Sequence, residues 1–229
     1  MLLPFSSIPR EEALRYLGWR GGVLPPELEQ LLEDCIREMS AVCAPRYVWR
    51  RLPLERQGEV LSAGGLVLPG VQLSRLLSDC SACVIFALTL GDAPEALIRR
   101  AAAVHRTRAL MLDACASAAC EQSCDDLQAL LEEQLRPEGL FATVRYSPGY
   151  GDLPLSLQPR LLELLNASRQ IGLTLTESLL MTPRKSVTAI FGLSDRMQPR
   201  QRSGCAGCAL NQTCSFRKAG IQCGSKSES

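Results

Sequence analysis

The sequence predicts an α+β fold, with a twisted, mainly antiparallel sheet flanked by helices and followed by a cysteine-rich C-terminal tail. Helical and extended patterns occur in runs without strict alternation, which is typical of α+β proteins. Residues 26–42 place apolar side chains three and four positions apart, as in a helix with one buried face. Residues 83–90 are short and almost continuously apolar, which favours a strand buried on both faces.

Prolines and glycines mark the ends of the elements expected in the first half of the chain. Pro26 stands at the start of the helix over residues 26–42, Gly64 and Gly65 divide a hairpin, and Gly91 ends the buried strand. The other elements expected there are a helix at 11–17, a strand at 46–52, the hairpin within 59–68 and a short helix at 71–77.

The second half begins with a long helical region, residues 94–135, expected in two pieces that meet near His105. A strand at 141–146, a Pro/Gly loop at 147–155 and a helix at 157–168 follow. Three short β segments, 173–175, 179–182 and 187–193, are close enough in sequence to pair with one another as antiparallel strands.

The composition divides the 229 residues into two regions. Residues 1–194 form the main domain, on which the helical N-terminal segment, residues 1–44, is expected to pack. Residues 195–229 are polar, basic and almost free of aliphatic side chains, and form a tail or a small metal module.

Charge and hydropathy exclude several classes of partner. The formal net charge of +1 predicts no binding of nucleic acid or of an anionic membrane. The longest apolar stretch is far below the roughly 20 residues of a membrane span. The N-terminal apolar run is too short for a signal peptide. We therefore expect a cytoplasmic protein whose 11 cysteines are mostly reduced.

The loop over residues 145–154 carries the side chains best suited to a ligand. Gly149 and Gly151 let the backbone approach a bound molecule closely. Arg145 offers a forked donor for a carboxylate, and Tyr150 offers a flat face for a ribose or purine. These groups suit a zwitterionic ligand that contains adenine, although many Pro/Gly loops are only rigid connections.

Two motifs give a resemblance to a known family. Arg145-x-x-x-Gly149-Tyr150, followed after a helix by residues 171–178 (Ile-Gly-Leu-Thr-Leu-Thr-Glu-Ser), resembles the activation domain of cobalamin-dependent methionine synthase. In that family the Arg-Pro-Ala-Pro-Gly-Tyr motif binds S-adenosylmethionine (SAM). Free-standing bacterial versions of the domain share further motifs with this chain, at residues 15–18, 112–115, 149–155 and 183–189, and a cysteine-bearing tail.

The resemblance implies a role for each matching residue. Arg145 would contact the SAM carboxylate or its neighbourhood, Ser147 would offer backbone groups to the adenine, and Tyr150 would pack near the ribose. The remaining residues expected to bind the cofactor are Gly149, Glu121 and Glu177. Two family acids are missing, because Ser117 and Gly139 stand at their positions.

The same resemblance implies reductive reactivation of an inactive cob(II)alamin. The chain would be the SAM-binding subunit of a split methionine synthase, with cobalamin on a cobalamin-binding partner subunit and electrons from a flavodoxin- or ferredoxin-type donor. It would be an accessory subunit without catalytic residues of its own. The only histidine, His105, is expected to be a surface or packing residue rather than a cobalt ligand.

Four tail cysteines are candidate metal ligands, namely Cys205, Cys208, Cys214 and Cys223. Their spacing permits a zinc site or an iron–sulfur cluster, and a reduced tail without metal is the third interpretation. Cys80 and Cys83 are expected to pack rather than to bind metal, as are the three cysteines of the long helix.

Two other functions fit portions of this pattern. One is a reactivator of a different corrinoid methyltransferase, in which the tail holds the redox cluster. The other is a zinc-stabilised binding module without SAM, which the missing acids at Ser117 and Gly139 favour. Arg184 and Lys185 have two interpretations, as exposed turn charges or as contacts to the corrin or the partner.

Overall fold

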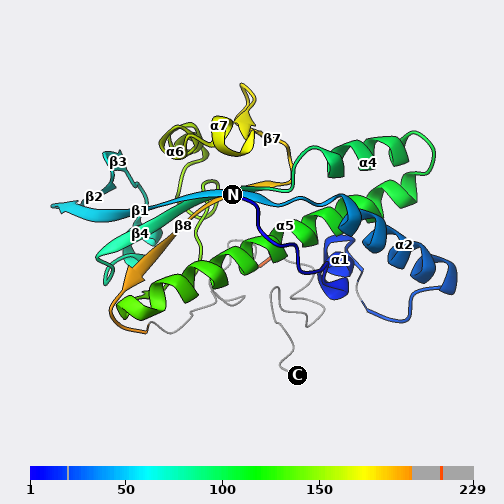
Figure 1. The fold of residues 1–229 in the computed structure, drawn as a ribbon, viewed down its shortest axis with the longest axis horizontal. Coiled ribbons are helices and arrows are strands. Elements are labelled where there is room, and N and C mark those ends of the chain that lie inside the picture. The colour runs from blue at the N-terminus through cyan, green and yellow to red at the C-terminus, as the bar shows by residue number, and fades with distance from the viewer. Residues whose placement is uncertain (20, 198–211, 214–229) are drawn as a thin grey trace.

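A six-stranded sheet runs through the protein in the order β3-β2-β1-β4-β8-β5 (Figure 1). In this computed structural model, residues 1–19, 21–197 and 212–213 are described. The strands are β1 Arg46–Gln57, β2 Val60–Ala63, β3 Leu66–Val67, β4 Ala82–Thr89, β5 Phe141–Ala142 and β8 Ser186–Ser194. All neighbouring strands of this sheet pair antiparallel, which confirms the α+β prediction.

The central strand β4 is buried along its whole length, as the apolar run predicted. It pairs with β1 on one side and with β8 on the other. Because successive side chains of a strand point to opposite faces, β4 contributes to two hydrophobic cores. Val84, Phe86 and Leu88 belong to one core. Cys83, Ile85 and Ala87 belong to the other.

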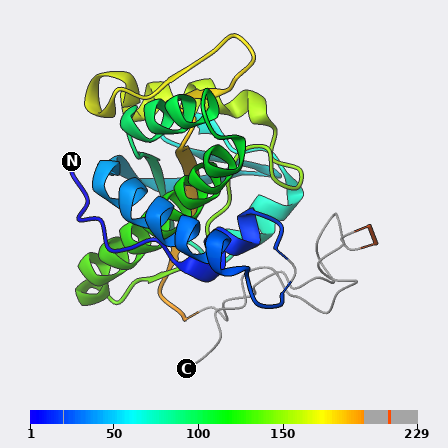
Figure 2. The ribbon, with the colours of Figure 1, turned by 90° about the vertical axis from the view of Figure 1, so that its right-hand side faces the viewer.

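Helix α5, Arg106–Leu135, crosses one face of the sheet and organises the first core (Figure 1). Its 30 residues correspond to ~45 Å of helix. Small side chains such as Ala116 and Ala119 are fully buried, so other helices approach closely. The helices in contact with α5 are α1 Arg10–Tyr16, α2 Pro26–Val42 and α4 Ala93–Ala102, at the end of the molecule that faces the viewer in Figure 2.

The opposite face of the sheet is covered by short helices (Figure 1). These are α3 Val71–Leu76, α6 Gln158–Leu165 and α7 Ala167–Ile171, with the 3-10 turn η2 Leu155–Leu157 leading into α6. A two-stranded hairpin of β6 Thr174–Leu175 and β7 Met181–Thr182 follows α7. A second 3-10 turn, η1 Arg136–Glu138, follows α5.

Three element predictions in the second half were wrong. The strand expected at 141–146 pairs continuously only over Phe141–Ala142, because the Thr143 hydroxyl accepts the backbone N–H of Gly192 at 2.9 Å. The chain regains one isolated bridge at Tyr146. The helix expected at 157–168 divides at Asn166, which adopts the left-handed conformation with φ 51°.

The third error concerns the three β segments expected to pair together. Only β6 and β7 pair, while β8 is a strand of the main sheet. Strand β8 has all but one of its residues buried, so it belongs between β4 and β5 rather than in a surface hairpin. Strand β8 ends at Ser194, where the boundary between the domain and the tail was expected. That division remains a prediction, because most of the tail lies outside the described residues.

Within the described ranges, no helix has the length and hydropathy needed to cross a membrane.

Candidate functional site

Arg145 follows β5 and is the first residue of the loop over residues 145–154. Its side chain points to α5. The guanidinium Nη1 donates to Asp125 Oδ1 at 2.8 Å and to Gln128 Oε1 at 3.3 Å. Its Nη2 lies 3.4 Å from Glu121 Oε2. Only 21% of the Arg145 side chain is exposed. Arg145 therefore has one short ionic contact, to Asp125, and one long ionic contact, to Glu121.

These acids belong to a row along α5, which we call the α5 stripe: Asp113, Ser117, Glu121 and Asp125. Residues four apart are neighbours on a helix surface, so each member lies one turn from the next. All four side chains are partly exposed. The stripe is the polar margin of a helix whose other faces are largely buried.

Lys185, just before β8, binds the other end of the stripe. Its Nζ lies 2.9 Å from Asp113 Oδ1 and 2.9 Å from Ser117 Oγ, and it donates to the Asp113 carbonyl at 3.1 Å. The Lys185 side chain is 14% exposed. Three carboxylates (Asp113, Glu121, Asp125) and two cations (Lys185, Arg145) leave the cluster with one net negative charge.

The loop after Arg145 is fastened to α3. Asp152 accepts the backbone N–H groups of Val71 and Gln72 at 2.6 and 3.1 Å, so it caps the first turn of that helix. The Tyr146 hydroxyl donates to Gln72 Oε1 at 3.0 Å. A Cβ at Gly151 would lie 2.0 Å from that hydroxyl, so a larger residue there would displace the Tyr146 side chain. The loop is thus held at both ends.

Tyr150 is at the outer side of this loop and 69% of it is exposed. The Gly149 N–H bonds to the Leu153 carbonyl at 2.8 Å, and the Tyr150 N–H bonds to the Ser147 carbonyl at 3.2 Å. Backbone hydrogen bonds therefore hold the turn, and the turn does not depend on contacts of the Tyr150 ring.

The family model described as "Vitamin B12 dependent methionine synthase, activation domain" matches residues 96–198. That segment contains α5, Arg145, the loop and Lys185. Residues 96–198 belong to the methionine synthase activation-domain family. The resemblance inferred from the motifs is thereby confirmed.

A solved structure has a fold similar to that of this chain. It is described as the MetH reactivation domain bound to AdoHcy, and it aligns with a TM-score of 0.61 at 19% sequence identity. The alignment covers 85% of this chain and 78% of that one. No curated protein matched the chain.

The structure brings together some of the expected cofactor residues and separates another. Arg145 and Glu121 are in contact, and Ser147, Gly149 and Tyr150 follow in the same loop. Glu177 lies in the turn between β6 and β7. The α6/α7 face carries that hairpin, whereas α5 with Glu121 covers the opposite face (Figure 1).

The two positions where family acids are missing have different surroundings. Ser117 accepts a hydrogen bond from the Lys185 ammonium, so a cation already occupies the neighbourhood of the missing carboxylate. Gly139 ends η1 with φ 71° and is exposed. The adjacent Glu138 pairs with Arg51 at 2.6 Å.

Three side chains of the candidate site were not among the expected cofactor residues: Asp125, Gln128 and Lys185. The first two have a sequence signal, since they lie four and seven positions after Glu121 and share its helix face. Lys185 lies in the shared motif at residues 183–189, which gave it two interpretations, as an exposed turn charge or as a contact to the corrin or the partner. Its neighbour Arg184 is an exposed turn charge, but Lys185 is largely buried.

The cysteines of the described residues pack as apolar side chains, as expected. Cys80, Cys83, Cys115, Cys120 and Cys124 are buried and free. Burial raises the pKa of Cys83 and Cys115 to about 12 and that of Cys80 to about 11, so these thiols stay protonated at neutral pH. No group of metal-ligating side chains occurs among the described residues. Cys205, Cys208, Cys214 and Cys223 lie outside them.

His105 is exposed, and its Nδ1 accepts the Arg108 N–H at 3.2 Å, which caps α5. It is therefore a surface residue with a local structural role, in agreement with the expectation.

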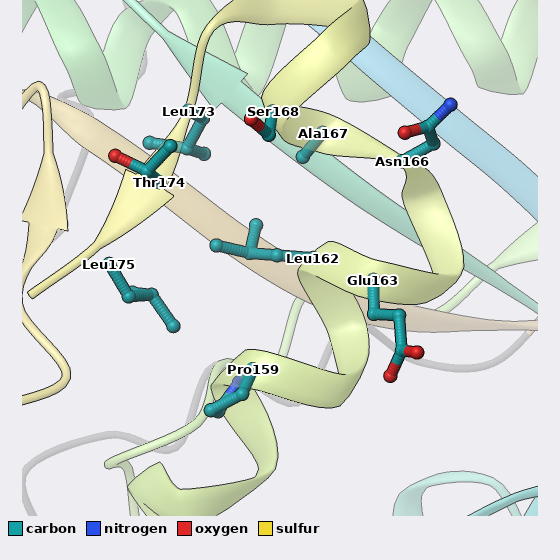
Figure 3. A pocket seen from close by; sticks show the side chains of 9 residues that line it. All are labelled: Pro159, Leu162, Glu163, Asn166, Ala167, Ser168, Leu173, Thr174 and Leu175. Carbon is teal, nitrogen blue, oxygen red and sulfur yellow. The ribbon is translucent and has the colours of Figure 1, made fainter. Parts of the chain in front are cut away.

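A surface hollow of about 370 Å³ lies away from the α5 stripe (Figure 3). It opens between α6, α7 and β6, and Leu162, Leu173 and Leu175 line it. Glu163, Asn166 and Thr174 are at its polar edge. Figure 3 shows no residue of the Arg145 site among its labelled side chains.

Proposed function

We propose that the chain binds SAM and serves as the separate reactivation subunit of a split cobalamin-dependent methionine synthase. In this role it supports the reductive methylation of cob(II)alamin held by a partner subunit. Two findings support the proposal besides the geometry: the activation-domain match of residues 96–198 and the likeness to a reactivation domain that binds AdoHcy.

The observation that carries the proposal is the ionic arrangement of Arg145. Asp125 holds the guanidinium by a short contact, while Glu121 lies farther away and has 45% of its side chain exposed. Burial alone would lower the pKa of the Arg145 guanidinium, but Cys124, Asp125 and Glu121 outweigh it and the pKa is raised. Arg145 therefore stays charged whenever a ligand arrives.

This arrangement fits the amino-acid end of SAM. The SAM carboxylate would pair with Arg145, and its ammonium or sulfonium would pair with Glu121. Binding would thus replace the long Arg145–Glu121 contact by one ion pair from each of these residues to the ligand. Asp125 would keep the guanidinium in place. The exchange leaves no buried charge without a partner, which keeps the cost of binding low.

The loop would hold the adenosine end. Gly149, at φ 89°, allows a close approach of the backbone, and Ser147 offers backbone groups to the adenine. The exposed Tyr150 ring would pack on the ribose, because aromatic rings gain stability when they cover a flat ligand face. Tyr146 and Asp152 hold the loop for this purpose.

The chemistry itself would take place at the cobalt of the partner. SAM supplies the methyl group, and a flavodoxin- or ferredoxin-type donor supplies the electron. The described side chains bind and orient SAM, so we propose an accessory subunit rather than a self-contained enzyme. A contact from Glu177 to the ligand remains a prediction, as do the cytoplasmic location and the division into residues 1–194 and 195–229.

The tail contributes a separate proposal. Zinc or an iron–sulfur cluster held by Cys205, Cys208, Cys214 and Cys223 would either stabilise the tail or carry the electron toward cobalt. Metal analysis and the absorption spectrum of anaerobically purified protein separate these, because zinc is colourless and a cluster absorbs visible light.

A reconstituted reactivation assay tests the proposed role. The full chain is mixed with a cob(II)alamin-loaded partner subunit, SAM and a reduced flavodoxin, and methylcobalamin is followed by absorbance. We expect methylcobalamin only when both the chain and SAM are present, and strongly reduced formation with Arg145→Ala. Equal formation without the chain would exclude the role. Binding of SAM without any activity on this partner would favour the reactivator of another corrinoid methyltransferase.

A further inference from the structure

Lys185 places a positive charge near a site that is proposed to bind a cation. Its ammonium has three donors, and three acceptors surround it: the Asp113 carboxylate, the Asp113 carbonyl and the Ser117 hydroxyl. The side chain is 14% exposed, so solvent screens it only partly. Lys185 is thus a fixed positive charge at the Asp113 end of the α5 stripe.

The position of this charge relative to Glu121 follows from helix geometry. Ser117, which contacts Lys185, lies four residues before Glu121 and therefore about 6 Å from it on the same face. Two charges at about 10 Å interact measurably when one of them is partly buried. A ligand cation paired with Glu121 would therefore sense both Asp113 and the ammonium that offsets it.

The charges of the possible ligands differ by one unit. SAM carries a sulfonium, an ammonium and a carboxylate, and is a cation overall. AdoHcy lacks the methyl group and the sulfonium charge, and is neutral overall. The cluster of Asp113, Glu121, Asp125, Arg145 and Lys185 has one net negative charge, which complements SAM and not AdoHcy.

We propose that Lys185, paired with Asp113, is a specificity-determining residue that limits the preference of the site for SAM over AdoHcy. The proposal rests on the proposed SAM site. Its physical content is a charge balance: without Lys185, Asp113 is no longer offset and the cluster carries two negative charges. The affinity of the site for the cationic ligand would then rise, while its affinity for the neutral ligand would change little.

A purely structural role of Lys185 makes a different prediction. The contacts of Lys185 also fasten the start of β8 to α5. If fastening is its only role, loss of Lys185 weakens or strengthens both ligands by the same factor. The ratio of the two dissociation constants therefore separates charge from packing.

The experiment measures SAM and AdoHcy affinities by calorimetry on the full chain at low salt. Lys185→Met removes the positive charge, Asp113→Asn removes the negative one, and the double variant removes both. Arg184→Met is the matched control, since it removes the same charge from the adjacent but exposed residue. Thermal melting of each variant reports whether it folds, and Asp113→Asn provides an independent arm if Lys185→Met does not.

We expect the ratio of AdoHcy to SAM dissociation constants to rise about three- to tenfold in Lys185→Met and to fall by a similar factor in Asp113→Asn. The double variant and Arg184→Met should stay within about twofold of wild type, and added salt should shrink the changes. An unchanged ratio in both single variants would overturn the inference while leaving the proposed function standing. Absence of binding of either ligand to wild type would overturn the proposed function and the inference with it.

Discussion

Arg145 and Asp125 form the shortest ionic contact of the candidate site, at 2.8 Å between guanidinium Nη1 and carboxylate Oδ1. They are 20 residues apart in the chain, so this contact joins the start of the loop to α5. It fixes the direction from which Arg145 can meet a second carboxylate. In the proposed site, Asp125 would therefore position Arg145 for the ligand.

We expect Asp125→Asn to lower SAM affinity about five- to thirtyfold, because a charged hydrogen bond that contributes roughly 1–2 kcal/mol is lost. Calorimetry of the variant measures the change. Asp126→Asn is a suitable control, since that neighbouring acid pairs with Ser6 and Gln122 instead. Equal affinity of the two variants would mean that Asp125 does not position Arg145.

Tyr150 should contribute to ligand affinity and hardly at all to stability. The residue is 69% exposed, so Tyr150→Ala should change the free energy of unfolding by less than about 0.5 kcal/mol. SAM affinity should fall severalfold, and Tyr150→Phe should retain most of it because the ring face remains. Urea unfolding and calorimetry on the same samples provide both numbers. A large loss of stability would show that Tyr150 supports the fold instead.

Asp152 should stabilise the fold by capping α3. Asp152→Ala removes the acceptor of two backbone N–H groups, which costs about 1 kcal/mol of unfolding free energy. It should also weaken SAM binding, since the loop loses one of its two anchors. The exposed Asp79 provides the control, and Asp79→Ala should leave both quantities unchanged. A stable Asp152→Ala variant would contradict the capping role.

Three cysteines that are wholly or partly buried should make the stability of the protein depend on pH in the alkaline range. Burial raises the pKa of the Cys35 thiol to about 11 and that of Cys43 and Cys83 to about 12, from an ordinary value of 9.0. The folded state therefore holds these protons when the unfolded chain releases them. Unfolding free energy should be level below about pH 9 and fall as the pH rises from there toward 12.

Urea unfolding at pH 7.5, 9 and 10 measures this dependence. Cys83→Ala removes one of the contributing thiols, so its stability should fall less steeply with pH than that of wild type. Identical slopes would mean that the Cys83 thiol ionises at the same pH in the folded and unfolded chain.

Local signals were sufficient for much of the fold. The break near His105, the turn at Gly64-Gly65 and the buried strand β4 were all predicted from short sequence patterns. The departures come from side chains that act at a distance or against propensity. The Thr143 hydroxyl replaces a ladder bond of β8, 49 residues away, and Asn166 adopts a left-handed conformation inside a helical pattern.

The candidate site likewise contains residues that local sequence patterns predicted and residues that depend on contacts distant in the chain. Arg145 and Glu121 were predicted from the motif, and Asp125 follows from the helical spacing after Glu121. The pairing of Lys185 with Asp113 joins residues 72 apart, so it depends on how β8 packs on α5. No local pattern distinguishes Lys185 from the exposed Arg184 beside it.

Calorimetric titration of SAM into the full chain, with Arg145→Ala and Tyr150→Ala beside wild type, tests the central claim most directly. We predict micromolar binding, roughly −8 kcal/mol, that both substitutions weaken, Arg145→Ala by more than about tenfold and Tyr150→Ala severalfold. Absence of binding heat in wild type, both alone and with the cobalamin-binding partner present, would contradict SAM binding and leave the metal of the tail as the first feature to pursue.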